Sequence, residues 1–272
     1  MVRDESDRLR QVIVCTPRIE YARGNCAIEK HNIGELGDPQ AAIQQHGNLK
    51  ASLEMFGVEV IDVPELGGHP NSVFTRDAAL STPQGYVKLR LGLGSRRGED
   101  EWMANALKRI GETCAGEIIA PGSVEGGDVV LAGEVAFIGQ SIRTNQEGID
   151  QLSEILVEMG YEIRIIVLPD TILHLDKVLM TLGEKTILYC KELVPETKLD
   201  GFDKLGISCG ENTTANIICL GDGELIVNKS NVRVIELLQT RGYIAHALNL
   251  SEFAKGMGGP NCLIMPVKRG AL

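Results

Sequence analysis

The sequence has no long apolar run, no excess of basic charge and no paired-cysteine motif. No apolar run in its 272 residues reaches the roughly 18 that a membrane-spanning helix needs. A net charge of −10 leaves no basic footprint for nucleic acid or anionic lipid. The N-terminal stretch MVRDESDRLR is too charged for a secretory signal. These absences predict a cytoplasmic protein that binds neither membrane nor nucleic acid.

The cysteines lack the spacing of a zinc protein or of a disulfide-rich protein. There are seven, an odd number, and no two form a Cys-x-x-Cys pair. This spacing argues against both a disulfide framework and a zinc site, and most of the thiols are expected to be buried small apolar side chains. The set is Cys15, Cys26, Cys114, Cys190, Cys209, Cys219 and Cys262.

What the sequence does contain is a repeated pattern: an amphipathic stretch, a glycine, then a short β-branched run. The glycines of the repeats are Gly57, Gly111, Gly160, Gly206 and Gly242, and each is expected to end a helix. Pairs of short strands around tight turns lie between them. Because such units bury their apolar faces only against each other, the repeat favours a closed radial α/β arrangement. An open, doubly wound parallel sheet remains the alternative.

The two ends of the chain are predicted to meet. The strand RQVIVCTP near the N-terminus would pair with CLIMPVK near the C-terminus and complete the fifth unit. No linker rich in Pro, Ser or Gly divides the sequence, so residues 1–272 are interpreted as one domain.

Acidic residues stand out at two places. In HPNSVFTRDAAL, an extended conformation would put Asn71 and Asp77 on one face and Arg76 on the other. In SVEGGDVVL, Glu125 and Asp128 bracket two glycines just before an apolar strand. Carboxylates in otherwise apolar stretches are candidates for binding a cationic group.

A histidine and a cysteine complete the candidate chemistry. HLDKVLM places His174 and Asp176 on a common strand face, where the acid could hold the imidazole. GMGGPNCLIMP puts Cys262 directly after a glycine-rich loop, which suits a thiol presented into a cavity. A cysteine nucleophile needs a nearby acid–base group, and His174 could supply it.

Together the segments PNSVFTRD, EGGD, SIRT, HLD and GGPNC resemble the guanidino-group modifying enzymes. This superfamily contains the arginine deiminases, dimethylargininases and amidinotransferases. The resemblance spans roughly residues 71 to 262. It implies the pentein fold, a five-bladed α/β propeller with fivefold pseudosymmetry and its catalytic site on the axis.

The resemblance also implies roles. Asp77 and Glu125 would clamp the planar guanidinium, Cys262 would attack its central carbon, and His174 would protonate the leaving amine and then activate water. A covalent S-alkylthiouronium would form and hydrolyse to citrulline. No metal and no cofactor is required.

The rest of the substrate needs its own partners. The family spacing selects Arg96 and Arg143 for an α-carboxylate, with Arg97 as the fallback for Arg96. Asn71 would bind the amino-acid portion. The polar segment of residues 17–32 is expected to be a mobile flap. The role of Asp128 stays open between bracing the loop, contacting an arginine and touching substrate.

The substrate itself is predicted from two opposing signals. The short chain resembles a dimethylargininase, whereas Asn71, Arg76 and Asp176 match the arginine deiminase pattern. A third carboxylate, Asp176, suits a guanidinium that keeps all its N–H donors, so unmethylated arginine is favoured and methylated arginines stay open.

Three other functions remain alternatives to the hydrolase. They are an amidinotransferase on the same fold, a non-catalytic pentein that binds a partner, and an unrelated cysteine hydrolase with an oxyanion hole. The acidic chain and the intact set of acid, histidine and cysteine residues argue against the second, and the paired carboxylates argue against the third. A homodimer is the default expectation for a soluble enzyme.

Overall fold

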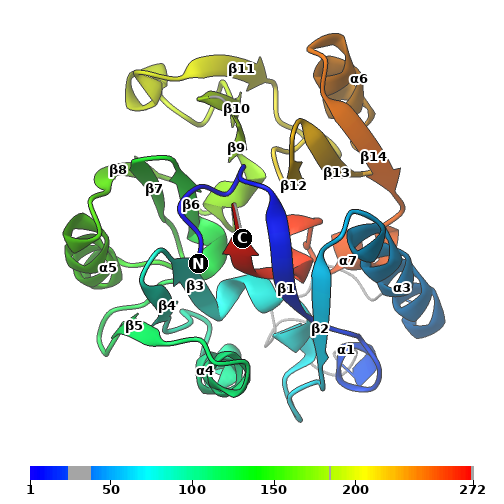
Figure 1. Ribbon diagram of the computed structural model, residues 1–272, viewed down its shortest axis with the longest axis vertical. Helices are drawn as coiled ribbons and strands as arrows, with labels where there is room; N and C mark the ends of the chain where they lie inside the picture. Colours follow the sequence, from blue (N-terminus) through cyan, green and yellow to red (C-terminus); the bar gives the residue numbers. More distant parts are fainter. Residues whose placement is uncertain (24–37, 184, 271–272) are drawn as a thin grey trace.

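Five small β-sheets radiate from a central axis and carry most of their helices on the outside (Figure 1). The computed structural model describes residues 1–23, 38–183 and 185–270. Each sheet has three strands, and we call each sheet with its outer connection a blade. The predicted fold, a five-bladed α/β propeller, is therefore confirmed, and the open parallel sheet is excluded.

All five blades share one topology, in which a middle strand pairs antiparallel with the innermost strand and parallel with the outermost. From the axis outward, the strands are β15 (Met265–Arg269), β1 (Leu9–Cys15) and β2 (Glu59–Val63); β3 (Ala79–Thr82), β4 (Gly85–Lys88) and β5 (Cys114–Glu117); β6 (Val129–Ala132), β7 (Val135–Gln140) and β8 (Glu162–Val167); β9 (Leu179–Gly183), β10 (Thr186–Cys190) and β11 (Asp203–Ile207); β12 (Ile218–Gly221), β13 (Glu224–Asn228) and β14 (Ile244–Leu248).

The chain ends close the ring, as predicted. Strand β1 pairs antiparallel with β15, and Ile13 lies opposite Met265. The N-terminal ammonium donates to the carbonyl of Val267 at 2.7 Å, and β1 and β15 lie side by side near the centre of Figure 1. The first blade is therefore built from segments at opposite ends of the sequence.

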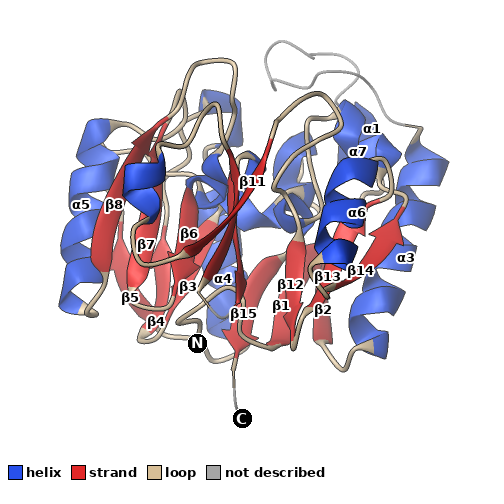
Figure 2. Cartoon of the chain, turned by 90° about the horizontal axis from the view of Figure 1, so that it is seen from above, coloured by secondary structure: helices blue, strands red, loops and turns tan. Residues whose placement is uncertain are grey.

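The helices cover the outside of the strands (Figure 2). They are α1 (Glu20–Arg23), α3 (Pro39–Met55), α4 (Glu99–Arg109), α5 (Gln146–Glu158), α6 (Val232–Thr240) and α7 (Ser251–Lys255). Helix α5 shows why they form: Asn145 caps its N-terminus, Ile149 and Leu152 are buried against the sheet, and Gly160 follows its end with φ +83°. A positive φ at this position favours glycine.

The fourth blade departs from the predicted repeat. Gly206 lies inside β11 and does not end a helix. The connection from β10 to β11 contains a single 3-10 turn, Glu196–Leu199, in place of an α-helix. Pro195 precedes that turn, and Gly201 takes the left-handed conformation at φ +86°. The connection is too short for a full helix, so the predicted role of Gly206 as a helix end is wrong.

The prediction of an extended conformation just before the innermost strands is also wrong. Residues 70–77 form two 3-10 turns, Pro70–Val73 and Thr75–Asp77. Pro70 fixes φ at the first turn, where a missing N–H is tolerated. Residues 175–177 form a similar turn. These turns bring the sequence motifs to one end of the propeller axis.

One pair of cysteines is bonded, although the spacing argues against a disulfide framework. Cys190 at the end of β10 and Cys209 beyond β11 form a disulfide, with their Cα atoms 5.5 Å apart. It is a single link within one blade and not a framework. Cys15, Cys219 and Cys262 are buried free thiols, whereas Cys114 is exposed.

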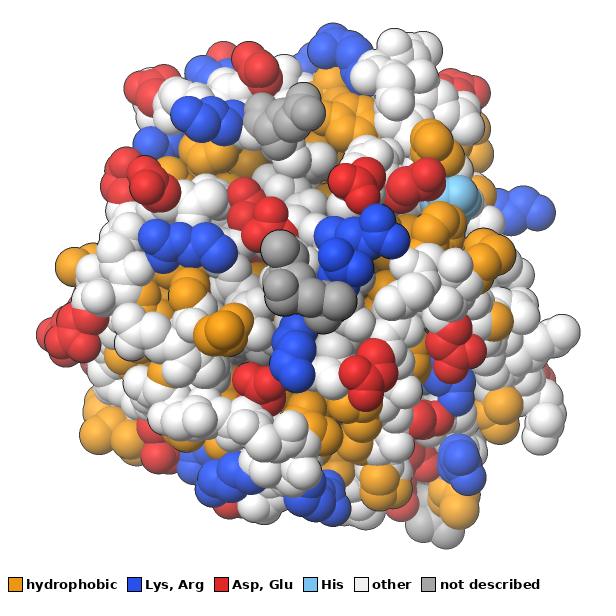
Figure 3. Space-filling view, viewed as in Figure 1, with side chains coloured by type: hydrophobic (Ala, Val, Ile, Leu, Met, Phe, Trp, Pro, Cys, Tyr) orange, Lys and Arg blue, Asp and Glu red, His pale blue; other side chains and the backbone are white. Residues whose placement is uncertain are grey.

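One face of the molecule carries charges of both signs (Figure 3). Figure 3 shows acidic and basic side chains interspersed over the face drawn in Figure 1, without a continuous basic area. None of the helices in the described part of the chain has the length and apolar character to cross a membrane.

Candidate active site

A small cavity at one end of the axis brings most of the predicted site residues together. Its volume is about 20 Å³, room for about one water molecule. It is lined by Asn71, Phe74, Asp77, Arg96, Arg143, Leu173, His174, Gly256, Met257, Gly258 and Cys262. Glu125 and Asp176 are fully buried beside it.

His174 lies between the two carboxylates predicted to clamp a guanidinium. Its Nε2 is 2.8 Å from Oε2 of Glu125, and its Nδ1 is 3.8 Å from Oδ1 of Asp77. Burial lowers the pKa of His174, but Asp77 and Glu125 outweigh it and raise that pKa to about 9. The imidazole is therefore positively charged at neutral pH and can donate a proton.

Glu125 is the most heavily contacted acid of the site. Its Oε1 accepts from the Gly92 amide at 3.1 Å and from Arg143 at 3.2 Å. Burial acts to raise its pKa, but the hydrogen bond from His174 and the charges of Arg96 and Arg143 hold that pKa well below the usual range. Glu125 is thus a carboxylate whose cationic partners come from the protein itself.

The two glycines of EGGD are required by close contacts. A Cβ on Gly127 would lie 2.8 Å from the His174 ring and 3.0 Å from Oδ1 of Asp77. A Cβ on Gly126 would lie 2.1 Å from the carbonyl oxygen of Arg76. The Gly127 amide also donates to Asp77 at 3.1 Å. Only a chain without side chains can pass between these groups and place Glu125 at the axis.

Asp128 braces the loops, which was one of the three roles left open. It accepts hydrogen bonds from the Leu175 amide at 3.0 Å and from Ser141 and Thr144 at 2.7 Å each. Burial raises its pKa to about 6. Asp128 therefore joins the EGGD turn to the turn that follows His174.

Arg96, not Arg97, faces the site. Its Nη1 donates to Asp77 at 2.6 Å and lies 3.7 Å from Glu125. Its Nε and Nη2 bind Glu99 at 2.9 and 2.7 Å. Arg97 lines a separate surface cleft. The guanidinium of Arg96 is thus already bound to carboxylates, which the prediction of a carboxylate-binding role did not anticipate.

Arg143 contacts the site through one nitrogen. Within the described part of the chain, its side-chain hydrogen bonds run from Nη1 to the two oxygens of Glu125, at 3.2 and 3.4 Å. It also lines the cavity. Of the two predicted arginines, Arg143 has more donor capacity left for a ligand.

Arg76 binds the EGGD turn and the strand that follows it. Its Nε donates to the Gly126 carbonyl at 3.2 Å, and its Nη2 donates to the Val129 carbonyl at 2.6 Å and pairs with the buried carboxylate of Glu5. It does not line the cavity. The residue taken as a sign of the deiminase pattern therefore holds the EGGD turn from behind.

Cys262 presents its Sγ to polar neighbours. Nδ2 of Asn216 lies 3.4 Å from Sγ, the Gly259 amide 3.3 Å and Oδ2 of Asp176 3.9 Å. Burial, followed by the charges of Asp176 and Asp77, raises the pKa of the thiol to about 12. In the resting site Cys262 is a neutral thiol.

Asn216 is the site residue that sequence reasoning missed. It is 2% exposed and lies just before β12, the innermost strand of the fifth blade. The predicted motifs Asp77, Glu125 and His174 each precede an innermost strand in the same way. The fivefold repeat was therefore the signal that pointed to a residue at this position.

The acids and the histidine could in principle hold a metal ion. Ligand atoms of Asp77, Glu125 and His174 all lie within 4.8 Å of one another, the one such group among the residues that the structure describes. Asp77 and Glu125, however, are paired with Arg96 and Arg143. The prediction of metal-independent chemistry stays a prediction.

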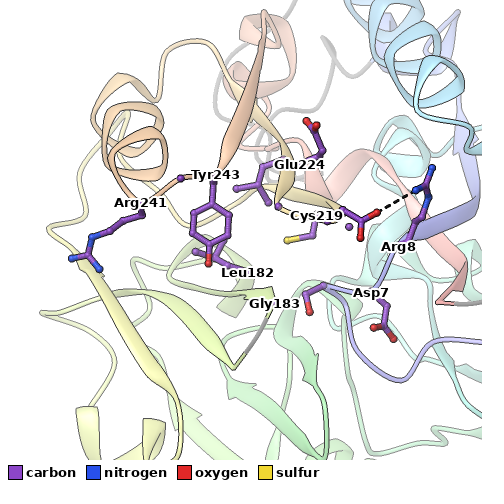
Figure 4. Close-up of a pocket in the computed structure, with 14 residues that line it drawn as sticks. Asp7, Arg8, Leu182, Gly183, Cys219, Glu224, Arg241 and Tyr243 are labelled. Atoms are coloured by element: carbon purple, nitrogen blue, oxygen red, sulfur yellow. Dashed lines mark hydrogen bonds and ion pairs between the residues drawn. The ribbon is translucent and has the colours of Figure 1, made fainter.

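Another cleft, of about 460 Å³, lies at the opposite end of the blades (Figure 4). There Arg8 pairs with Asp222 at 3.2 Å. The thiol of Cys219 donates to the Thr181 carbonyl, and burial raises its pKa to about 12. Among the described residues, the cleft has a thiol and acidic side chains in its lining but no histidine, so we place the chemistry at the smaller cavity.

The predicted flap is described only in part. Residues 24–32 of the segment 17–32 lie outside the described residues. Before them, Glu65 accepts hydrogen bonds from the amides of Arg18 and Ile19 at 2.8 and 2.7 Å. The hydroxyl of Tyr21 donates to the Glu252 carbonyl.

Comparison with known families divides the chain between two matches. Residues 19–204 match the family described as N,N dimethylarginine dimethylhydrolase, eukaryotic. Residues 209–269 match the family described as arginine deiminase. Together the two matches include every predicted site residue.

Individual relatives point the same way. The N(G),N(G)-dimethylarginine dimethylaminohydrolase of Pseudomonas aeruginosa is 31% identical over 230 residues, covering 84% of this chain and 90% of its own. An arginine deiminase of Listeria monocytogenes is 27% identical, and the match covers 74% of this chain and 62% of the relative. A cysteine-to-serine mutant of the Pseudomonas aeruginosa dimethylargininase, complexed with citrulline, superimposes with a TM-score of 0.82 at 28% identity, covering 95% and 99% of the two chains.

Proposed function

Since this chain belongs to the guanidino-group modifying enzymes, the superfamily of dimethylargininases and arginine deiminases, we propose that it hydrolyses the guanidino group of unmethylated arginine to citrulline and ammonia. The reaction type follows from the family: the chain is a hydrolase of C–N bonds in linear amidines. The choice of substrate rests on the site.

One buried oxygen carries the choice of unmethylated arginine. Asp176 is fully buried, and its Oδ2 accepts from Nδ2 of Asn261 at 3.0 Å. Its Oδ1 has no hydrogen-bond partner among the described residues. A guanidinium N–H would satisfy this acceptor, whereas an N-methyl group would leave it unpaired. An unpaired buried acceptor costs about 1–3 kcal/mol.

Cys262 and His174 would carry the covalent steps. Binding of the cationic substrate lowers the high resting pKa of Cys262, and the thiol proton is lost to solvent. Sγ then bonds to the guanidino carbon, and the C–N bond breaks as imidazolium His174 gives its proton to the departing ammonia. Neutral His174 next takes one proton from water, whose oxygen attacks the same carbon. The C–S bond then breaks, the remaining hydroxyl proton passes to Sγ to restore the thiol, and the carbonyl of citrulline forms.

Asp77, Glu125 and Arg143 would hold the substrate. Asp77 and Glu125 accept from the guanidinium, and Arg143 pairs with the α-carboxylate through its remaining donors. Arg96 already contacts Asp77 at 2.6 Å, so substrate must replace that contact. Asn71, at the cavity wall, would bind the amino-acid portion. Because the cavity is only about 20 Å³, binding requires the lining side chains to move.

Hydrolysis of methylated arginine is the second candidate. It is favoured by the family match over residues 19–204 and by the Pseudomonas aeruginosa relative. A non-catalytic pentein is less well supported, because the acids, imidazole and thiol meet at one cavity. An amidinotransferase is less well supported, because the family models that match the chain are those of two hydrolases.

A competition between two substrates tests the proposal. Citrulline formation is measured colorimetrically with arginine and with asymmetric dimethylarginine, and kcat/KM is compared. We expect arginine to be preferred by roughly 10–100-fold, the equivalent of one unpaired buried acceptor. Asp176→Asn should lower that ratio. The asparagine side chain has one acceptor oxygen instead of two, so it does not need a hydrogen-bond donor at both terminal atoms. A preference for dimethylarginine in the unaltered protein would contradict the choice, and no citrulline from either would contradict both candidates.

A further inference from the structure

Each innermost strand of the propeller is preceded by a short segment that reaches the axis. Four of these segments carry the residues of the proposed reaction: Asp77 before β3, Glu125 before β6, His174 before β9 and Cys262 before β15. The fifth carries Asn216, before β12. By position in the fold, Asn216 is the equivalent of the four proposed catalytic residues.

The side chain of Asn216 joins the thiol to the loop that carries it. Its Nδ2 donates to Sγ of Cys262 at 3.4 Å, and its Oδ1 accepts from the Asn261 amide at 2.9 Å. The loop passes so close that a Cβ on Gly259 would lie 2.2 Å from Oδ1. Both ends of the Asn216 side-chain amide are therefore held. These contacts also determine that Nδ2, the donor, is the end that faces Sγ.

The surroundings of Sγ are divided between groups that oppose a negative charge and groups that favour it. Asp176 and Asp77 disfavour the thiolate, whereas Lys177 and the Gly259 amide favour it. Lys177 is held by the Met257 carbonyl at 2.6 Å. An N–H donor aimed at Sγ is worth most once the sulfur is ionised, because hydrogen bonds to charged groups are the stronger ones.

We propose that Asn216 is a positioning residue for Cys262: its N–H fixes the direction of Sγ and stabilises the thiolate that attacks the guanidino carbon. The proposal rests on the proposed role of Cys262 as nucleophile. In the resting thiol the Cys262 S–H points toward Oδ2 of Asp176, 3.9 Å away. The donors from Asn216 and Gly259 already face Sγ in this resting arrangement, at 3.4 and 3.3 Å.

Alkylation by iodoacetamide tests this without any substrate. The rate at Cys262 is followed by mass spectrometry of its peptide, which separates it from the exposed Cys114. We expect Asn216→Ala to slow alkylation about tenfold at each pH below the wild-type midpoint, equivalent to about one pKa unit. Asn216→Asp should slow it further, because it keeps the acceptor for Asn261 but turns a carboxylate oxygen toward Sγ.

A matched control separates this role from a packing role. Asn231 and Asn216 both line a second cavity, which neighbours the active-site cavity. The side-chain amide of Asn231, however, donates to the Thr214 carbonyl at 2.8 Å. Asn231→Ala should lower Tm and leave the alkylation profile unchanged. Wild-type alkylation profiles for Asn216→Ala, or for Asn216→Asp if the alanine variant does not fold, would overturn the proposal. The alkylation assay uses no arginine, so its result does not depend on whether the proposed substrate is correct. An error in the assignment of the nucleophile would be detected separately, as retained activity in Cys262→Ser.

Discussion

The charge of His174 should make stability depend on pH. The imidazole lies 2.8 Å from Glu125 and 3.8 Å from Asp77, and these acids raise its pKa from 6.5 to about 9 against the effect of burial. The folded state therefore binds this proton more tightly than the unfolded state. The stabilisation is fully present below pH 6.5 and is lost as the pH rises through about 9. At about 1.4 kcal/mol per unit, the loss is about 3 kcal/mol.

Urea unfolding of the wild type and His174→Gln between pH 6 and pH 10 measures this loss. Other groups titrate in the same window, but they are common to both proteins and cancel in the difference. We expect the free energy of unfolding of the wild type, relative to the variant, to fall by about 3 kcal/mol between pH 6 and pH 10. A difference that does not change with pH would refute the argument, since it would mean that His174 has an ordinary or lowered pKa.

Three further substitutions test single contacts. Cys262→Ser should abolish citrulline formation while Tm changes by only a few degrees, because the substitution removes the nucleophile and little volume; full activity would exclude the thiol mechanism. Gly127→Ala should lower kcat at least tenfold, since its Cβ would lie 2.8 Å from the His174 ring; wild-type kcat would show that the loop has room. Arg76→Met should lower the free energy of unfolding by about 3–5 kcal/mol in urea titrations, because it leaves the carboxylate of Glu5 buried and unpaired; a loss under 1 kcal/mol would mean that water reaches that acid.

The general architecture could be predicted because it depends on patterns that recur along the sequence. Glycine-ended helices and paired short strands recur along the chain, and the apolar strands at the two ends need partners. The five-sheet arrangement and the pairing of the two end strands are both confirmed. Gly206 misled because a glycine inside a short strand looks the same in sequence as one after a helix. The absence of room for a helix in that connection depends on the whole unit, including Pro195 and Gly201.

The local shape of the site could not be predicted from alternation. Asn71 and Asp77 were placed together by assuming an extended chain, whereas two 3-10 turns bring both to the cavity wall. The two residues do lie at the same cavity, but for a different reason. The turns end at the axis because the next residues begin an innermost strand. Asn216 was missed since no acid, thiol or imidazole marks it, and only the repeat of strand positions reveals it.

The pairing of the acids with internal arginines is the least predictable feature and changes how the site works. Arg96 presents a guanidinium to Asp77 at 2.6 Å, and Glu99 anchors it from the other side. A substrate guanidinium therefore exchanges one cation for another at this carboxylate, and net binding energy depends on the difference between them. The ureido group of citrulline is uncharged, so it competes poorly with Arg96 once hydrolysis is complete. By this reasoning the same contact that limits substrate affinity also favours product release.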